Sequence, residues 1–122
     1  MTNYTKMYIA VRDDVPDFMV PTLVAHAVLG AEDYFIDNAD DVIYFTYMNW
    51  RCNSFRKVVV RVNQKEFEKI QSTLVHYAAH ENTTCNAEKT CLVVLPVESD
   101  DVPNVLKYAK MWEPKPTPWG EE

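Results

Sequence analysis

The spacing of hydrophobic positions changes several times along the chain, and each spacing predicts a type of secondary structure. An apolar run with β-branched and aromatic members at 6–12 (KMYIAVR), closed by Asp13 and Asp14, predicts a buried strand. After a loop with two prolines, Pro21 suits a first helical position and Gly30 suits a helix end. Apolar residues between them keep a period of 3.6: Val20, Leu23, Val24, Ala27 and Val28. The chain therefore opens as a βα unit.

The second half of the chain repeats this alternation. Residues 57–62 (KVVVRV) predict a strand, and Asn63 with Glu66 has the spacing of a capping box that starts a helix over 64–79. The apolar face of that helix would hold Phe67, Ile70, Leu74, Tyr77 and Ala78. Residues 91–96 (CLVVLP) predict a third strand. A last helix is predicted to open at Asp100, Asp101 and Pro103. Its core-facing side chains would be those of Val102, Val105, Leu106, Ala109 and Trp112.

The segment 38–53 is ambiguous on local evidence. The run from Val42 to Tyr47 favours a strand on propensity. Val42, Phe45 and Met48 nevertheless recur with helical spacing, and Asn38 is a candidate helix cap with Asp40 and Asp41 in the first turn. Local evidence alone leans to a strand.

Alternating strands and helices predict a three-layer α/β/α sandwich with a small, mostly parallel or mixed sheet of about four strands. We expect a single domain over 1–112 and a proline-rich, extended tail over 113–122. Ligands of such sheets bind beyond the carboxyl ends of strands, which directs attention to the loops 12–20, 97–101 and 80–90.

Composition removes several classes of function. The two glycines lie in no phosphate-loop or dinucleotide pattern, so a nucleotide cofactor is not expected. The three cysteines have no CxxC spacing, so neither a zinc site nor a disulfide framework is expected. The apolar run before Arg12 is too short for a signal peptide or a membrane span. We therefore expect a cytoplasmic protein without a metal or cofactor.

Charge is unevenly distributed. The formal net charge of −6 argues against nucleic-acid binding, because affinity for phosphate backbones comes largely from lysine and arginine. However, five acids without a base lie between Glu32 and Asp41, and five bases without an acid lie between Arg51 and Lys65. One basic face therefore remains compatible with the sequence.

Candidate chemistry lies around the first predicted strand. Asp13 and Asp14 follow that strand directly, and His26 lies one to two turns into the next helix, on the flank of its apolar stripe. A carboxylate near a histidine can fix its tautomer and make it a better general base or acid. By itself this arrangement is more typical of a structural histidine. A thiol enzyme using Cys85 or Cys91 is disfavoured, because Cys91 falls in a predicted core strand.

The order of these motifs resembles the type 2 peptidyl-tRNA hydrolase superfamily. The segment Lys6-Met-Tyr-Ile-Ala-Val-Arg12-Asp13-Asp14 followed by Val24-Ala25-His26-Ala27 is similar to the family's first strand and its A-x-H-A helix. The strands 56–62 and 89–96 look like the family's K-K-V-V-L-K-V and T-K-T-V-L-A-I-G-P strands. The resemblance spans about 6–110. It implies a helix before the second strand and so favours helix for 38–50, which ends at Trp50.

The resemblance also implies a monomeric or homodimeric hydrolase that cleaves the ester between a peptide and tRNA without a metal. Two family loops differ here. VPDFMVP replaces a lysine- and glycine-containing loop after the first strand, and His80-Glu81-Asn82-Thr83-Thr84 replaces D-A-G-R-T. Thr83 or Thr84 matches the threonine of the second loop, and Thr90 matches the threonine that opens the last strand.

Two functions remain open at this point. The first is a divergent hydrolase of peptidyl-tRNA, with His26, Asp14, Thr84 and Thr90 as candidate catalytic residues and Arg12, Arg51, Arg56 and Lys57 as candidate tRNA contacts. The second is a non-catalytic relative that uses the same cleft to bind a small ligand or a protein partner. The local basic stretch favours the first function, and the acidic net charge and altered loops favour the second.

Overall fold

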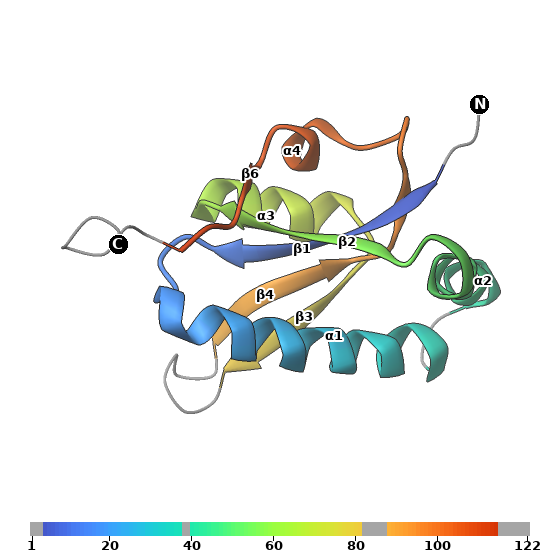
Figure 1. Ribbon diagram of the computed structural model, residues 1–122, viewed down its shortest axis with the longest axis horizontal. Coiled ribbons are helices and arrows are strands. Elements are labelled where there is room, and N and C mark those ends of the chain that lie inside the picture. Colours follow the sequence, from blue (N-terminus) through green and yellow to red (C-terminus); the bar gives the residue numbers. More distant parts are fainter. Residues whose placement is uncertain (1–3, 38–39, 82–87, 115–122) are drawn as a thin grey trace.

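Strand β1 (Thr5–Arg12) lies at the centre of a mixed sheet in the computed structural model, which describes residues 4–37, 40–81 and 88–114 (Figure 1). It pairs in parallel with β2 (Arg56–Val62) and antiparallel with β4 (Glu88–Val94) and β5 (Val97–Glu98). The outer strands are β3 (His76–Glu81) next to β4, and β6 (Lys110–Met111) next to β2. The expected mixed sheet is confirmed, but it has six strands rather than about four.

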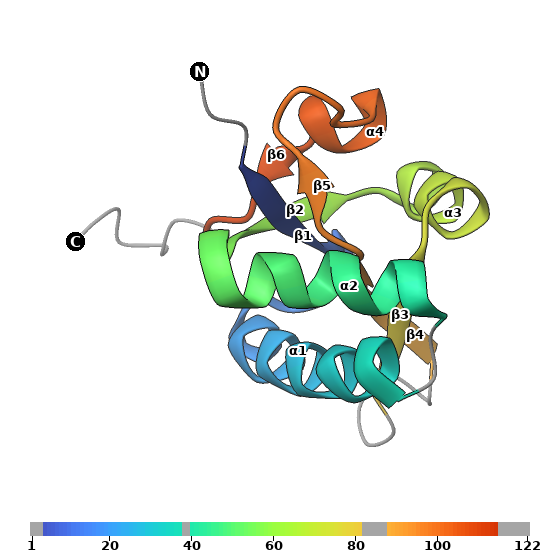
Figure 2. The ribbon, with the colours of Figure 1, turned by 90° about the vertical axis from the view of Figure 1, so that its right-hand side faces the viewer.

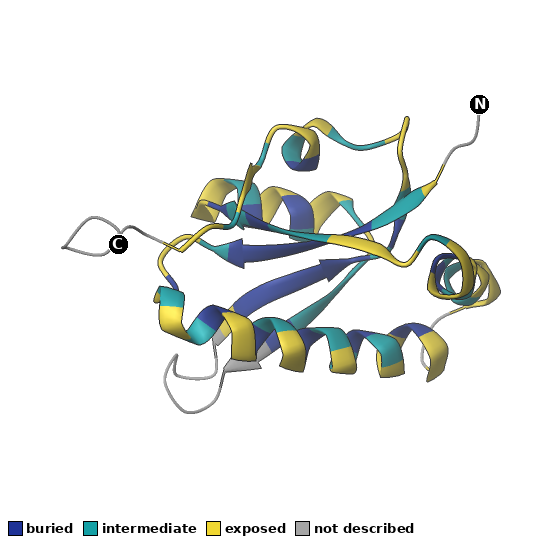
Figure 3. Cartoon of the chain, in the orientation of Figure 1, coloured by how far each residue is buried: buried dark blue, intermediate teal, exposed yellow. Residues whose placement is uncertain are grey.

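Helices cover both faces of this sheet, which confirms the three-layer α/β/α sandwich. Helices α1 (Val20–Asp37) and α2 (Asp41–Asn49) pack with Met7, Ile9 and Val11 of β1. Helices α3 (Gln64–Thr73) and α4 (Asn104–Lys107) pack with Tyr8 and Ala10 on the other face (Figures 1 and 2). Successive residues of a strand point to opposite faces, so the uninterrupted apolar run of β1 serves two cores (Figure 3).

The ambiguous segment before β2 is a helix, as the resemblance implies. Helix α2 is capped by Asp40, whose side chain accepts a 3.0 Å hydrogen bond from the backbone N–H of Ile43. Asn38, the expected cap, lies outside the described residues. The chain continues as a π-helical turn, Trp50–Ser54, that ends at Phe55. Burial of Tyr47 and Trp50 against α1 and β1 outweighs the strand propensity of this segment.

The predicted helix over 64–79 is wrong in its second half. Its start is confirmed, because Asn63 and Glu66 form both hydrogen bonds of a capping box, each 2.8 Å long. Helix α3 ends at Thr73, however, and residues 76–81 form the edge strand β3, antiparallel to β4. Tyr77 and Ala78 fit a helical period, but in the fold they belong to β3, which pairs with the backbone of β4 along its outer edge.

The end of the domain also differs from the expectation. The third predicted strand is β4, which begins earlier, at Glu88, and ends at Val94. The last helix is only the single turn α4, which opens after Pro103, and Ala109 and Trp112 lie beyond it. The backbone N–H of Trp112 instead donates to the carbonyl of Val59, next to the pairing of β6 with β2. Of the tail over 113–122, only residues 113 and 114 are described.

Gly30 does not end α1, which continues through it to Asp37. A Cβ atom at Gly30 would overlap the Tyr77 hydroxyl and lie 2.7 Å from Cζ and 2.8 Å from Cε2 of that ring. Glycine is therefore required here by the close packing of α1 on β3, and the interpretation of Gly30 as a helix end is wrong.

We predict that Gly30→Ala lowers the free energy of unfolding by about 1–3 kcal/mol, although alanine is the better helix former. Urea denaturation checks this result. Leu29→Ala is the matched control, because Leu29 is 71% exposed on the same helix and its truncation should change stability little. A Gly30→Ala protein as stable as the wild type would contradict the close contact with Tyr77.

Candidate functional site

The carboxyl ends of β1 and β2 form a topological switch point. The two strands are parallel neighbours, with Arg12 opposite Val62, but α1 leaves β1 toward one face of the sheet and α3 leaves β2 toward the other. The backbone N–H of Asp13 donates a 2.8 Å hydrogen bond to the carbonyl of Val62 and ties the two ends together. Ligands of open α/β sheets bind at such points. The expected loop 12–20 lies here.

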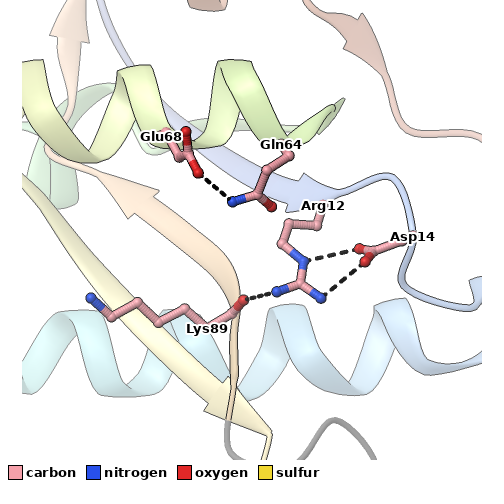
Figure 4. A network of polar contacts seen from close by, with 5 residues as sticks. All are labelled: Arg12, Asp14, Gln64, Glu68 and Lys89. Atoms are coloured by element: carbon pink, nitrogen blue, oxygen red, sulfur yellow. Dashed lines mark hydrogen bonds and ion pairs between the residues drawn. The ribbon is translucent and has the colours of Figure 1, made fainter.

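Arg12 connects three segments at this end of the sheet (Figure 4). Its Nε and Nη2 donate to the two carboxylate oxygens of Asp14, at 2.9 and 3.1 Å. Its Nη1 donates to the carbonyl of Lys89 at 2.8 Å. The guanidinium therefore fixes the loop after β1 against the beginning of β4. Bidentate pairs of this kind fix orientation as well as distance.

A surface pocket of about 460 Å³ lies beside this network and is lined by Arg12, Asp14, Gln64, Phe67, Gln71 and Lys89. Gln64 is the first residue of α3, so the positive end of that helix dipole faces the same region as Arg12 and Lys89. Fixed donors, a helix N-terminus and cationic side chains favour an anionic or oxyanionic group. We call this pocket with its Arg12 network and Thr90 the β1-end site.

Thr90 occupies an irregular position at the edge of this site. The pairing of β3 with β4 passes from Ala79–Cys91 to His80–Lys89, so Thr90 is the extra residue of a β-bulge. Thr90 is fully buried, and its hydroxyl has no hydrogen-bond partner among the described residues. Buried hydroxyls are normally bonded, and bulges often redirect a side chain beside a functional site. Thr90 thus directly follows Lys89, whose carbonyl Arg12 bonds, and its hydroxyl is not used by any described residue.

A second ion pair fixes the loop after β1 from the opposite face of the sheet. Arg61 of β2 donates at 2.9 Å to Asp17, in the short 3-10 helix Asp17–Met19, and at 2.9 Å to the carbonyl of Glu113. Val15 is buried between the two ion pairs along the loop. The loop is therefore held by packing and by two arginines, where the resemblance implies a glycine-rich segment.

A family model described as Peptidyl-tRNA hydrolase PTH2 matches residues 5–112. The match covers both parallel strands, the helices on both faces and the β1-end site. The chain belongs to this family. No curated protein matches the chain. Family membership makes the protein peptidyl-tRNA hydrolase-like and agrees with the motifs around Arg12 and His26.

The structure brings together only some of the candidate site residues. Arg12 and Asp14 lie in the β1-end site, and Thr90 lies at its edge. His26 is exposed on α1, does not line the pocket and forms no hydrogen bond or ion pair with any described residue. Thr84 lies outside the described residues.

The other basic candidates lie far from this site. Arg56 and Lys57 begin β2, and Arg51 precedes them in the π-helical turn. Arg56 is paired with Lys6, six residues before the Arg12–Val62 pair, which corresponds to roughly 20 Å along the strands. These three cations therefore cannot contact a group bound beside Arg12.

Sequence reasoning missed Gln64, Gln71 and Lys89 as pocket residues. The capping box at Asn63 was the available signal, because it places the start of a helix directly after a parallel strand. The position of Lys89 depends on the pairing of β3 with β4. The sequence pattern did not predict this pairing, because it assigned part of β3 to a helix over 64–79.

Neither Cys91 nor any metal-binding group supports thiol or metal chemistry within the described part of the chain, and Cys85 lies outside it. Burial raises the pKa of the Cys91 thiol to about 12, so this cysteine carries no reactive thiolate near neutral pH. No group of three histidine, cysteine, aspartate or glutamate side chains among residues 4–37, 40–81 and 88–114 is placed to hold a metal ion. Within the same ranges, no helix is long and apolar enough to cross a membrane.

We predict that Arg12→Met lowers the free energy of unfolding by about 1–2 kcal/mol, because the Lys89 carbonyl and the loop after β1 lose their common donor. Chemical denaturation measures this loss. Lys89→Met is the control, since it removes an exposed ammonium but keeps the carbonyl that Arg12 bonds. Equal stability of both variants would mean that the Arg12 network does not hold the loop.

Proposed function

We propose that the protein hydrolyses the ester bond of peptidyl-tRNA and binds the ester end of the substrate in the β1-end site. The observation that carries this proposal is the polar pocket at the topological switch point, where Arg12, Lys89 and the N-terminus of α3 meet, with Thr90 next to Lys89 in the chain. Membership of the peptidyl-tRNA hydrolase PTH2 family supports the choice of substrate.

Ester hydrolysis requires an activated water and a donor for the oxyanion that develops on the ester carbonyl. In the proposed mechanism Arg12, Lys89 and the N-terminus of α3 attract phosphate or the oxyanion. The hydroxyls of Thr90 and Thr84 orient water, and Asp14 is positioned to accept a further hydrogen bond while Arg12 holds its carboxylate.

His26 is the proposed general base in this scheme, which requires the scissile ester to extend from the pocket towards α1, because His26 does not line the pocket. The imidazole projects from the solvent side of α1 and is bonded to no described side chain, so a substrate lying across α1 has access to it. A base that forms its contacts only with substrate is compatible with such an open position. The scheme uses no metal and no cofactor.

Arg51, Arg56 and Lys57 are proposed to meet phosphates of the same tRNA at a distance from its ester. Their separation of roughly 20 Å from Arg12 excludes contact with the reacting group but is small relative to a folded tRNA. A homodimer and a cytoplasmic location remain parts of the same proposal.

One observation favours the alternative, a non-catalytic relative that binds a small ligand or protein in the same cleft. The loop 13–19 contains no lysine or glycine, and the polar groups of Arg12 and Asp14 are largely engaged with each other. Such a site would bind its ligand without turning it over.

Release of peptide from a tRNA carrying an N-blocked amino acid tests the proposal. We predict turnover above the uncatalysed rate by the wild type, and a decrease in kcat of roughly 10²-fold for Thr90→Val, which removes only the hydroxyl. Because that hydroxyl is buried without a partner among the described residues, the same substitution should leave stability unchanged or raise it.

Two further variants complete the experiment. His26→Ala should lower kcat, whereas Thr22→Val, an exposed threonine one turn earlier on α1, should not. Absence of wild-type turnover at high enzyme concentration would remove the hydrolase proposal. Tight binding of a tRNA that carries its peptide through an amide would then support the non-catalytic alternative.

A further inference from the structure

The amino ends of β1 and β2 carry a group of cations that lie against aromatic rings, at the opposite end of the sheet from the β1-end site. Figure 2 looks onto this end, where both strands begin beside α2. The Lys57 Nζ lies 3.5 Å from the centroid of the Phe55 ring, and the Arg51 guanidinium carbon lies 4.9 Å from it. The Arg56 guanidinium carbon lies 3.8 Å from the centroid of Tyr4. We call Tyr4, Arg51, Phe55, Arg56 and Lys57 the aromatic-basic surface.

The backbone of Phe55 is strained where it ends the π-helical turn. Its φ angle of 55° is left-handed, a conformation that costs a bulky side chain about 1–2 kcal/mol. Hydrogen bonds impose it: the N–H of Phe55 donates to the carbonyl of Trp50, and the Trp50 indole donates to the carbonyl of Arg56. The ring is nevertheless 45% exposed. Strain that presents an aromatic ring to solvent is more typical of a functional surface than of packing.

The charge of this surface is only partly compensated. Arg51 forms an ion pair with Glu32 at 3.1 Å. The hydrogen bond from the Tyr47 hydroxyl, together with that from Arg51, holds the pKa of Glu32 below its ordinary value. Arg56 and Lys57 are exposed and form no ion pair with any residue in the described ranges. Two cations without an ion pair to a described residue therefore follow one another at the start of β2, with Arg56 against Tyr4 and Lys57 against Phe55, in a protein whose net charge is −6.

We propose that the aromatic-basic surface binds an unpaired segment of RNA, a proposal that rests on the proposed function for RNA as the partner. Guanidinium and ammonium groups bind phosphates, and bases stack on aromatic rings and on guanidinium planes. Contact with the Tyr4 ring restrains the guanidinium of Arg56, which remains on an exposed residue. Lys57 also donates at 2.8 Å to the Phe55 carbonyl, which fixes its ammonium beside the ring.

Binding of RNA without an ester separates this proposal from hydrolysis. Fluorescence anisotropy with deacylated tRNA and with a single-stranded oligouridine, titrated with salt, measures affinity and the number of phosphate contacts. The Arg56→Gln/Lys57→Gln double variant should weaken binding about tenfold and reduce the slope of log affinity against log salt by roughly 1.4. Lys69→Gln, an exposed lysine on α3, is the control that removes charge elsewhere and should leave both values near those of the wild type.

Phe55→Asn distinguishes a binding role from a structural one. Asparagine tolerates the left-handed backbone, so relief of strain offsets the lost ring contact with Trp50 and the fold should persist. RNA affinity should nevertheless fall about tenfold with the loss of the stacking surface.

The peptide-release assay provides a further test of the aromatic-basic surface. In the hydrolysis assay the double variant should raise KM and leave kcat unchanged. Unaltered RNA affinity in both the double variant and Phe55→Asn would overturn this proposal without affecting the hydrolase proposal. Absence of turnover by the wild type, together with RNA binding, would overturn the hydrolase proposal and leave the RNA-binding proposal unaffected. Binding to anionic lipid vesicles, or salt-sensitive self-association, in place of RNA binding would also overturn it.

Discussion

The parallel pairing of β1 with β2 is the constraint on which the rest of the structure depends. It brings Arg12 beside Val62 at one end of the sheet and Lys6 beside Arg56 at the other. Because α1 and α3 leave these two strands toward opposite faces, a crevice opens at the carboxyl ends. The same pairing also separates the polar pocket from the aromatic-basic surface by the length of the strands. The positions of both proposed sites therefore depend on the register of the β1–β2 pair.

The β1-end site is built mainly from contacts between segments that are distant in sequence. Arg12 joins the loop after β1 to the start of β4, and Arg61 holds the other side of that loop through Asp17. This loop contains no glycine, so packing and ion pairs give it its shape. Within this fixed frame the hydroxyl of Thr90 and Nη1 of Arg61 are buried without a hydrogen-bond partner among the described residues. Unsatisfied groups in a rigid frame are expected where a substrate completes the hydrogen bonding.

Local signals predicted the elements that are determined locally. The apolar runs of β1 and β2 and the capping box at Asn63 were sufficient, because burial and capping act over a few residues. The pattern failed where partners are distant. Tyr77 fits a helical period as well as a strand, and only pairing with β4 decides between them. Gly30 suits a helix end on local evidence, but it lies inside α1, where the Tyr77 ring leaves no room for a side chain. Arg12 and Asp14 follow a strand that the sequence predicts, so their place beside the pocket could be expected, whereas that of Lys89 depends on the distant pairing of β3 with β4.

The central claim is that the β1-end site holds the ester end of the substrate. Backbone amide chemical shifts, recorded while a short oligonucleotide carrying an amide-linked N-blocked amino acid at its 3′ end is added, test it most directly. The account predicts shifts at Arg12–Asp14, at Gln64 and at Lys89–Thr90, with smaller changes around His26. Shifts that leave these residues unchanged and appear elsewhere on the protein would contradict it.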